Sequence, residues 1–330
     1  MLSRHFAAFL IVPFWLSSIA IGADDLQKKH DLDALLAKAS VANLRSNGSP
    51  AFHLRLELHA EHITAKPVDG TYDEVWSAPD AWRREITFPE FKQVEVGDKD
   101  GRWVDRSLDF RPHPVHMVAR LLDSLMTPPL APNEKVIKLH KEKEGGMELQ
   151  CADLGAGPDH HTLCFDDVGR LFSTEYPAFR IEYLDYQKFG DASFPRHIRV
   201  YENREPVLEI KVSELGTPSE KQLQFPRHSP TALQLARCEL WDPGIPARKV
   251  APEYPPKARM DRMQGTVLLY AYLNADGSVQ KVRILQSGGA MLDQSAAKAV
   301  GHWVYSPTKC ENGSALPNEI EVSVNFRLSY

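Results

Sequence analysis

Alternating apolar and polar positions dominate the first two thirds of the chain. From residue 52 to residue 59, every even-numbered residue is Phe or Leu and every odd-numbered residue is polar. This period of two is typical of a strand with one buried face. Segments of similar strand-like character recur, separated by turn residues, at 72–76, 82–88, 92–96, 102–104, 148–152, 162–165, 179–186, 197–201 and 207–212. So many short strands predict one large antiparallel, barrel-like sheet.

Three stretches of the same region have a helical character instead. Residues 31–42 carry leucine at 32, 35 and 36, and residues 115–126 carry apolar side chains at 118, 121, 122 and 125. This spacing is typical of an amphipathic helix. A shorter helix-like stretch covers residues 231–240. Strands with a few helices, in no regular alternation, indicate an α+β protein.

The C-terminal segment switches between the two periods in a clear order. Pro255 and Pro256 suit the first turn of a short helix, where backbone donors lack partners. A strand at 264–273 then reaches Asp276-Gly277, a pair that favours a hairpin turn, before the return strand at 279–286. Apolar residues at 292, 296, 299, 300 and 303 follow at helical spacing, and 319–328 alternate again. We expect helix, strand, strand, helix, strand, with a three-stranded antiparallel sheet.

This order, together with several short motifs, resembles the C-terminal domain of TonB. The motifs are Tyr254-Pro255, Gln264-Gly265-Thr266-Val267, Asp276-Gly277-Ser278-Val279, Ser287-Gly288, His302-Trp303-Val304-Tyr305-Ser306-Pro307 and Val324-Asn325-Phe326. No single motif is specific, but the ordered set covers residues 249–328. The resemblance implies a binding protein of the cell envelope, linked to transport across the outer membrane, which is not an enzyme and needs no cofactor.

In that family the domain grips the TonB box of an outer-membrane receptor, and the box peptide adds as a strand beside the last strand of the sheet. An edge strand suits this role because its backbone donors and acceptors are unpaired on one side. The alternation turns the odd-numbered residues from 319 to 327 outward. The candidate edge residues are Glu321, Val322, Ser323, Val324, Asn325, Phe326 and Arg327. Two alternatives stay open: another part of the chain covers this edge, or the edge serves dimerisation.

A change of composition separates this unit from the strand-rich region. Residues 242–252 contain three prolines and a glycine, which indicates a linker between domains at 24–241 and 253–330. In the first domain, Tyr183-Leu184-Asp185-Tyr186, followed by Phe194-Pro195 and Ile198, is similar to the LolA and LppX class of periplasmic lipoprotein carriers. That resemblance implies a half-barrel and an alternative function, the periplasmic carriage of a lipid, a lipoprotein or an acyl chain, with the TonB-like domain as a docking module. A concave face filled by its own side chains fits the pattern equally well.

The first 23 residues have the order of a secretory signal peptide. Arg4 and His5 precede an uncharged apolar run to Ile21, and small residues lead to Ala23. The run is about 16 residues long and contains Pro13, whereas a helix that spans a bilayer needs ~20 apolar residues. We expect export to the periplasm with cleavage near Ala23. Without cleavage, the segment would be an inner-membrane anchor.

Export changes the interpretation of the four cysteines. An even number of cysteines in an oxidising compartment favours disulfides. Cys151 and Cys164 flank a turn-rich stretch between two strand-like segments, which favours a hairpin cross-link and leaves Cys238 with Cys310. The spacings contain no C-x-x-C, so a zinc ribbon is not favoured.

Charge and the remaining motifs argue against other functions. A net charge of -5 provides no general basic surface for nucleic acid. His113 and His116, like His160 and His161, lie in polar or proline-broken segments, so we expect solvated histidines and not metal ligands. The chain also lacks a Gly-rich phosphate loop and a G-x-S-x-G nucleophile motif.

Overall fold

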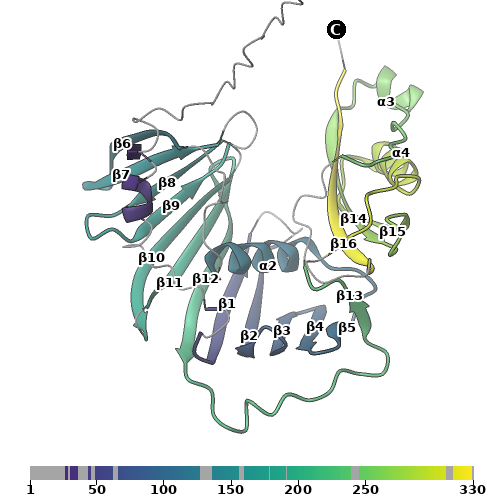
Figure 1. Cartoon of the computed structure of the whole chain (residues 1–330). Coiled ribbons are helices and arrows are strands. Elements are labelled where there is room, and N and C mark those ends of the chain that lie inside the picture. Colours follow the sequence, from purple (N-terminus) through teal and green to yellow (C-terminus); the bar gives the residue numbers. More distant parts are fainter. Residues whose placement is uncertain are drawn as a thin grey trace, which may run out of the picture.

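The computed structural model describes residues 27–28, 30–35, 44–45, 49–61, 66–126, 136–155, 160–177, 179–190, 192–238, 245–309 and 315–328. These residues form one sheet of 13 strands and one of three, over separate hydrophobic cores (Figure 1). The expected α+β class with two antiparallel sheets is confirmed. The expected signal segment, 1–23, lies outside the described residues. Among the residues described, no helix is both long and apolar enough to cross a membrane.

The large sheet consists of two meanders, β1 to β5 and β6 to β12, joined where β1 pairs with β12. A short strand, β13, adds beside β5. The strands are β1 (Phe52–Ala60), β2 (Val68–Ala78), β3 (Ala81–Phe88), β4 (Phe91–Asp98), β5 (Gly101–Arg106), β6 (Val136–Glu144), β7 (Met147–Leu154), β8 (His161–Phe165), β9 (Leu171–Glu175), β10 (Phe179–Phe189), β11 (Ala192–Glu202), β12 (Glu205–Gly216) and β13 (Leu233–Leu235).

Helix α2 (His113–Met126) lies across the inner face of this curved sheet (Figure 1). Val118 and Leu122, four residues apart and therefore on one side of the helix, are fully buried. They pack in the same core as Leu54 and Leu56, the even-numbered residues of β1 that the alternation turns inward. Side chains of the helix and the strands thus fill this part of the concave face together.

The small sheet has the strand order β15-β14-β16. Its elements follow the expected order: α3 (Pro256–Met260), β14 (Gly265–Leu273), β15 (Val279–Gln286), α4 (Ala290–Val300) and β16 (Asn318–Phe326). At the β14–β15 turn, Gly277 has a φ of +83°, and a Cβ there would lie 2.0 Å from the Tyr305 carbonyl oxygen. The turn therefore requires glycine for its backbone conformation and for its close approach to the segment after α4.

The expectations for residues 231–240 and for the two disulfides have different outcomes. The helix expected at 231–240 is wrong, because Leu233–Leu235 forms β13 and pairs with Arg102 to Val104 of β5. The disulfide between Cys151 and Cys164 is confirmed. Cys238 is also disulfide-bonded, but Cys310 lies outside the described residues, so their pairing stays a prediction.

Candidate peptide-binding edge strand

Strand β16 forms one edge of the small sheet, since β14 is its strand partner there. Val322, Val324 and Phe326 are buried in the core that the sheet shares with α4. Ser323 and Asn325 alternate with them and are exposed. In this second half of the strand, the side chains lie as the alternation predicts.

Two contacts indicate which backbone groups of β16 face β14. Just past the strand, the Leu328 N–H donates to Gln264 Oε1 at 3.0 Å, on the side of β14. Thr266 Oγ1 donates to Asn325 Oδ1 at 2.5 Å, across a directly opposed pair of residues. Side chains approach most closely at the pairs that exchange no backbone hydrogen bonds. We infer that the even-numbered residues of β16 bond to β14.

The odd-numbered residues of β16 then direct their backbone groups toward the open side. One of these donors is satisfied locally, because the Glu319 N–H donates to Asn318 Oδ1 at 2.8 Å. By the same inference the next three, at Glu321, Ser323 and Asn325, direct a row of donors and acceptors along the edge, where no described strand pairs with β16. Such a row is what an extended peptide needs for pairing.

The start of β16 is held by a buried ion pair with the large sheet. Glu319 accepts hydrogen bonds from Arg106, at the end of β5, and from the Tyr270 hydroxyl on β14 at 2.5 Å. Burial alone would raise the pKa of Glu319, but the guanidinium groups of Arg106 and Arg111 outweigh it and hold this pKa below its usual range. Burial and the Glu319 charge raise the pKa of Tyr270, so its hydroxyl keeps the proton that it donates. We call Arg106, Tyr270 and Glu319 the Glu319 clasp.

Glu321, the first candidate edge residue, contacts the first turn of α2. Its Oε2 lies 2.8 Å from His113 Nδ1 and 3.7 Å from His116 Nε2. Burial, and then the charge of Arg111, lower the pKa of His116 to about 2, so its ring is neutral. Arg111 donates to His116 Nδ1 at 3.0 Å. The single ring proton therefore lies on Nε2, toward Glu321.

Three further contacts, in two places, join the two sheets. Asp109, in the segment after β5, pairs with Arg283 at 2.6 Å and with Lys281 at 3.2 Å, both on β15. The residues after β13 run beside the start of β16, where the Ala236 N–H donates to the Pro317 carbonyl oxygen at 2.9 Å. The small sheet is thus attached to the large one through both its edge strands.

These contacts correct part of the outward face expected for 319–327. Glu319 is 2% exposed and Glu321 is partly buried, because Arg106 of β5 and the first turn of α2 cover the first half of the strand. His116 and His161 are buried, so the expectation of solvated histidines is wrong for both. Arg106 was missed by sequence reasoning, although the alternation of β5 turns it to the same face as Val104. An arginine at an inward position is a signal of a buried counter-charge.

Comparison with known proteins agrees with the resemblance of the C-terminal unit. Residues 250–328 match the family of the Gram-negative bacterial TonB protein C-terminal. The chain is 34% identical over 87 residues to Protein TonB of Vibrio cholerae and 38% identical over 80 residues to Protein tonB2 of Pseudomonas aeruginosa. The protein therefore carries a TonB C-terminal domain.

The matched region is a minor part of each protein. The match to the Vibrio relative covers 26% of this chain and 35% of that protein. The match to the Pseudomonas relative covers 24% of this chain and 29% of that protein. The chain thus spans about a third of the length of the curated relatives that it matches. Among solved structures, a LolA superfamily protein from Nitrosomonas europaea is similar over 59% of this chain and 97% of its own, with 10% identity and a TM-score of 0.38.

Proposed function

We propose that this protein is a non-enzymatic binding protein of the periplasm, whose domain at 253–330 takes up a TonB-box peptide of an outer-membrane receptor by strand addition to β16. The row of backbone groups that we assign to the edge of β16, at Glu321, Ser323 and Asn325, carries the proposal, since β14 is the described strand that pairs with β16. The TonB C-terminal match supports the choice of partner. The same proposal includes energy transfer to transport across the outer membrane. It also includes a linker at 242–252, which joins this domain to the one at 24–241.

The geometry of the edge limits the length of the peptide. Alternate residues of a strand bond to the same neighbour, so three open residues pair with about six residues of an added strand. The exposed side chains of this row, Ser323 and Asn325, are small or polar, and Arg327 follows at the exposed end. Recognition therefore rests mainly on the backbone, and outward side chains contribute modestly.

Proline substitution of an open backbone donor tests strand addition. Ser323→Pro and Asn325→Pro each remove an N–H that we assign to the open side, so both are expected to abolish peptide binding while the sheet stays folded. The matched controls are Ser323→Ala and Asn325→Ala, which keep the N–H and are expected to bind within about threefold of the unchanged chain, since they remove only side chains at exposed positions. Val324→Pro removes a donor that faces β14 and is expected to unfold the small sheet.

The measurement is fluorescence anisotropy of a labelled TonB-box peptide titrated with the full chain, with circular dichroism as the check of folding. Loss of binding in the folded proline variants, and its retention in the alanine variants, would support strand addition at β16. Equal binding by all the folded variants would place the peptide elsewhere. Absence of binding by any such peptide to the unchanged chain would contradict the proposed partner.

The carriage of a lipid is the second candidate function, because the inner face of the large sheet presents a continuous apolar wall. Phe165, Phe194 and Ile198 are fully buried on that wall, as is Leu122 of α2. An acyl chain that entered this core would have to displace side chains that now fill it, Leu122 among them. Native mass spectrometry of the purified full chain tests this function: a co-purifying lipid supports it, and a single ligand-free mass after purification from membranes contradicts it.

A further inference from the structure

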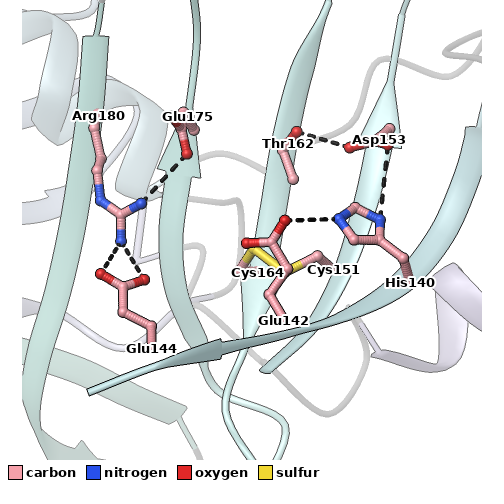
Figure 2. Close-up of a disulfide and its surroundings, with 9 residues drawn as sticks. All are labelled: His140, Glu142, Glu144, Cys151, Asp153, Thr162, Cys164, Glu175 and Arg180. Carbon is pink, nitrogen blue, oxygen red and sulfur yellow. Dashed lines mark hydrogen bonds and ion pairs between the residues drawn. A yellow bond between two sulfur atoms is a disulfide. The ribbon is translucent and has the colours of Figure 1, made fainter. Parts of the chain in front are cut away.

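A histidine and two cysteines lie in one row across three neighbouring strands of the large sheet. His140 of β6 is directly opposite Cys151 of β7, and Cys151 is directly opposite Cys164 of β8 (Figure 2). Directly opposed residues of antiparallel strands place their side chains on the same face. Glu142 is two residues beyond His140 on β6, so it joins them on that face. Ligand atoms of His140, Glu142 and Cys151 lie within 4.8 Å of one another.

The histidine is oriented as a metal ligand would be. Its Nε2 is 3.0 Å from Glu142 Oε1, and its Nδ1 is 3.7 Å from Asp153 Oδ2. Asp153 is itself fixed by Thr162, whose hydroxyl donates to Asp153 Oδ1 at 2.8 Å. His140 Nδ1 is buried, with no partner at hydrogen-bond distance among the described atoms. In histidines that bind metals, the second ring nitrogen usually donates to a carboxylate, and Asp153 lies on that side of His140, beyond hydrogen-bond distance.

We propose that this row is a redox-gated metal site, which takes a Zn²⁺-class cation when the Cys151–Cys164 disulfide is reduced. Two thiolates, the His140 Nε2 and a Glu142 oxygen supply the four mixed sulfur, nitrogen and oxygen ligands that tetrahedral zinc accepts. Asp153 acts as a positioning residue for the imidazole. The disulfide and the metal are alternatives, because only a thiolate, and not a disulfide sulfur, is a strong ligand.

The change from the disulfide to the metal-bound dithiolate balances in electrons and protons. A dithiol reductant donates two electrons and two protons to the Cys151–Cys164 bond and becomes a disulfide itself. The cation then displaces the two thiol protons, which pass to solvent. Glu142, whose side chain is 52% exposed, lies on the route from solvent. Leu149 and Phe172 form an apolar cluster with Cys151 and Cys164, which limits the access of water to the cysteine end of the row.

Cobalt is the probe, because Co²⁺ bound by thiolates absorbs visibly and takes zinc-like sites. The full chain, reduced with a dithiol and kept without oxygen, is expected to bind Co²⁺ with a thiolate absorption band that Zn²⁺ abolishes; the oxidised chain is expected to show no band. His140→Ala, Cys151→Ser and Cys164→Ser are each expected to weaken Co²⁺ binding at this site at least tenfold. Asp153→Asn, which acts through His140, is expected to weaken it about 10–100-fold.

The matched control is His59, which also lies between two carboxylates, Asp69 at 2.6 Å and Glu61 at 3.1 Å, but belongs to β1. His59→Ala is expected to leave the cobalt spectrum and affinity unchanged. Circular dichroism of the reduced chain, before and after the metal, checks that the sheet persists. Reduced protein that keeps its sheet but gives no thiolate band overturns the proposal. So does an affinity that is equal in the His140→Ala and unchanged chains, or a reduced sheet that unfolds and is not restored by the metal.

Discussion

Removal of one charged partner of the Glu319 clasp is expected to lower the free energy of unfolding of the chain substantially. The side chains of Arg106 and Glu319 are each 3% exposed. Glu319→Gln removes the carboxylate that contacts the buried Arg106 charge and leaves it only the weaker attraction of Glu95. Arg106→Met leaves the buried Glu319 carboxylate with Tyr270 as its neutral donor and with the weaker attraction of Arg111. In both variants a buried charge loses its partner, which is the costly case for an ion pair.

The expected magnitude follows from this burial. Removal of one member of a buried pair costs about 3–5 kcal/mol of the free energy of unfolding, whereas removal of both charges is often close to neutral. Arg106 Nε is buried without a hydrogen-bond partner among the described atoms, and loss of such a group relieves about 1–3 kcal/mol. We therefore expect Arg106→Met near the lower end of the range and Glu319→Gln near the upper end.

A double-mutant cycle measures the effect. Urea unfolding of the unchanged chain, the two single variants and the double variant is followed by circular dichroism and by tryptophan fluorescence, which includes Trp303 of the small domain. The double variant is expected to be more stable than the sum of the single effects predicts, by about 3 kcal/mol. Single effects that add within about 0.5 kcal/mol would refute the coupling, and with it the burial of the pair.

Three further outcomes follow from residues near the edge strand. Gly277→Ala is expected to lower the free energy of unfolding by more than the ~1–2 kcal/mol that a positive φ costs, because the Tyr305 carbonyl is also close. Gly145→Ala, which has a positive φ but open space around it, should cost only that amount. Urea unfolding midpoints of the two variants test the difference. Asp109→Asn should leave the midpoint unchanged, because its pair with Arg283 is exposed and screened. Below pH 6.5 the unfolded chain protonates His116 while the folded chain does not. Stability should therefore fall by about 1.4 kcal/mol per pH unit, and His116→Gln should remove that slope.

The parts of the fold that depend on local patterns could be predicted from the sequence. The alternation at 319–328 and the Asp276-Gly277 turn specify β16 and the hairpin without reference to distant residues. The disulfide at Cys151 and Cys164 could be predicted for the same reason, because the two cysteines flank one turn.

What could not be predicted depends on contacts between distant segments. Leu233–Leu235 consists of good helix formers, and its pairing with β5 overrides that preference and makes it a strand. The burial of Glu319 could not be predicted either, because alternation alone turns Glu319 outward, as it does Asn325. The difference between the two is that Arg106, more than two hundred residues earlier, lies over one of them and not the other.

The clasp also decides how a mechanical load would enter the molecule. A peptide paired with β16 and pulled along its axis strains all its backbone hydrogen bonds in parallel, so they must break together. The tension then passes along β16 to Glu319 and through Arg106 into β5, which is hydrogen-bonded into a sheet of 13 strands. A force applied to the small domain would thus be shared with the large domain, and the segment that connects the two domains would bear only part of that force.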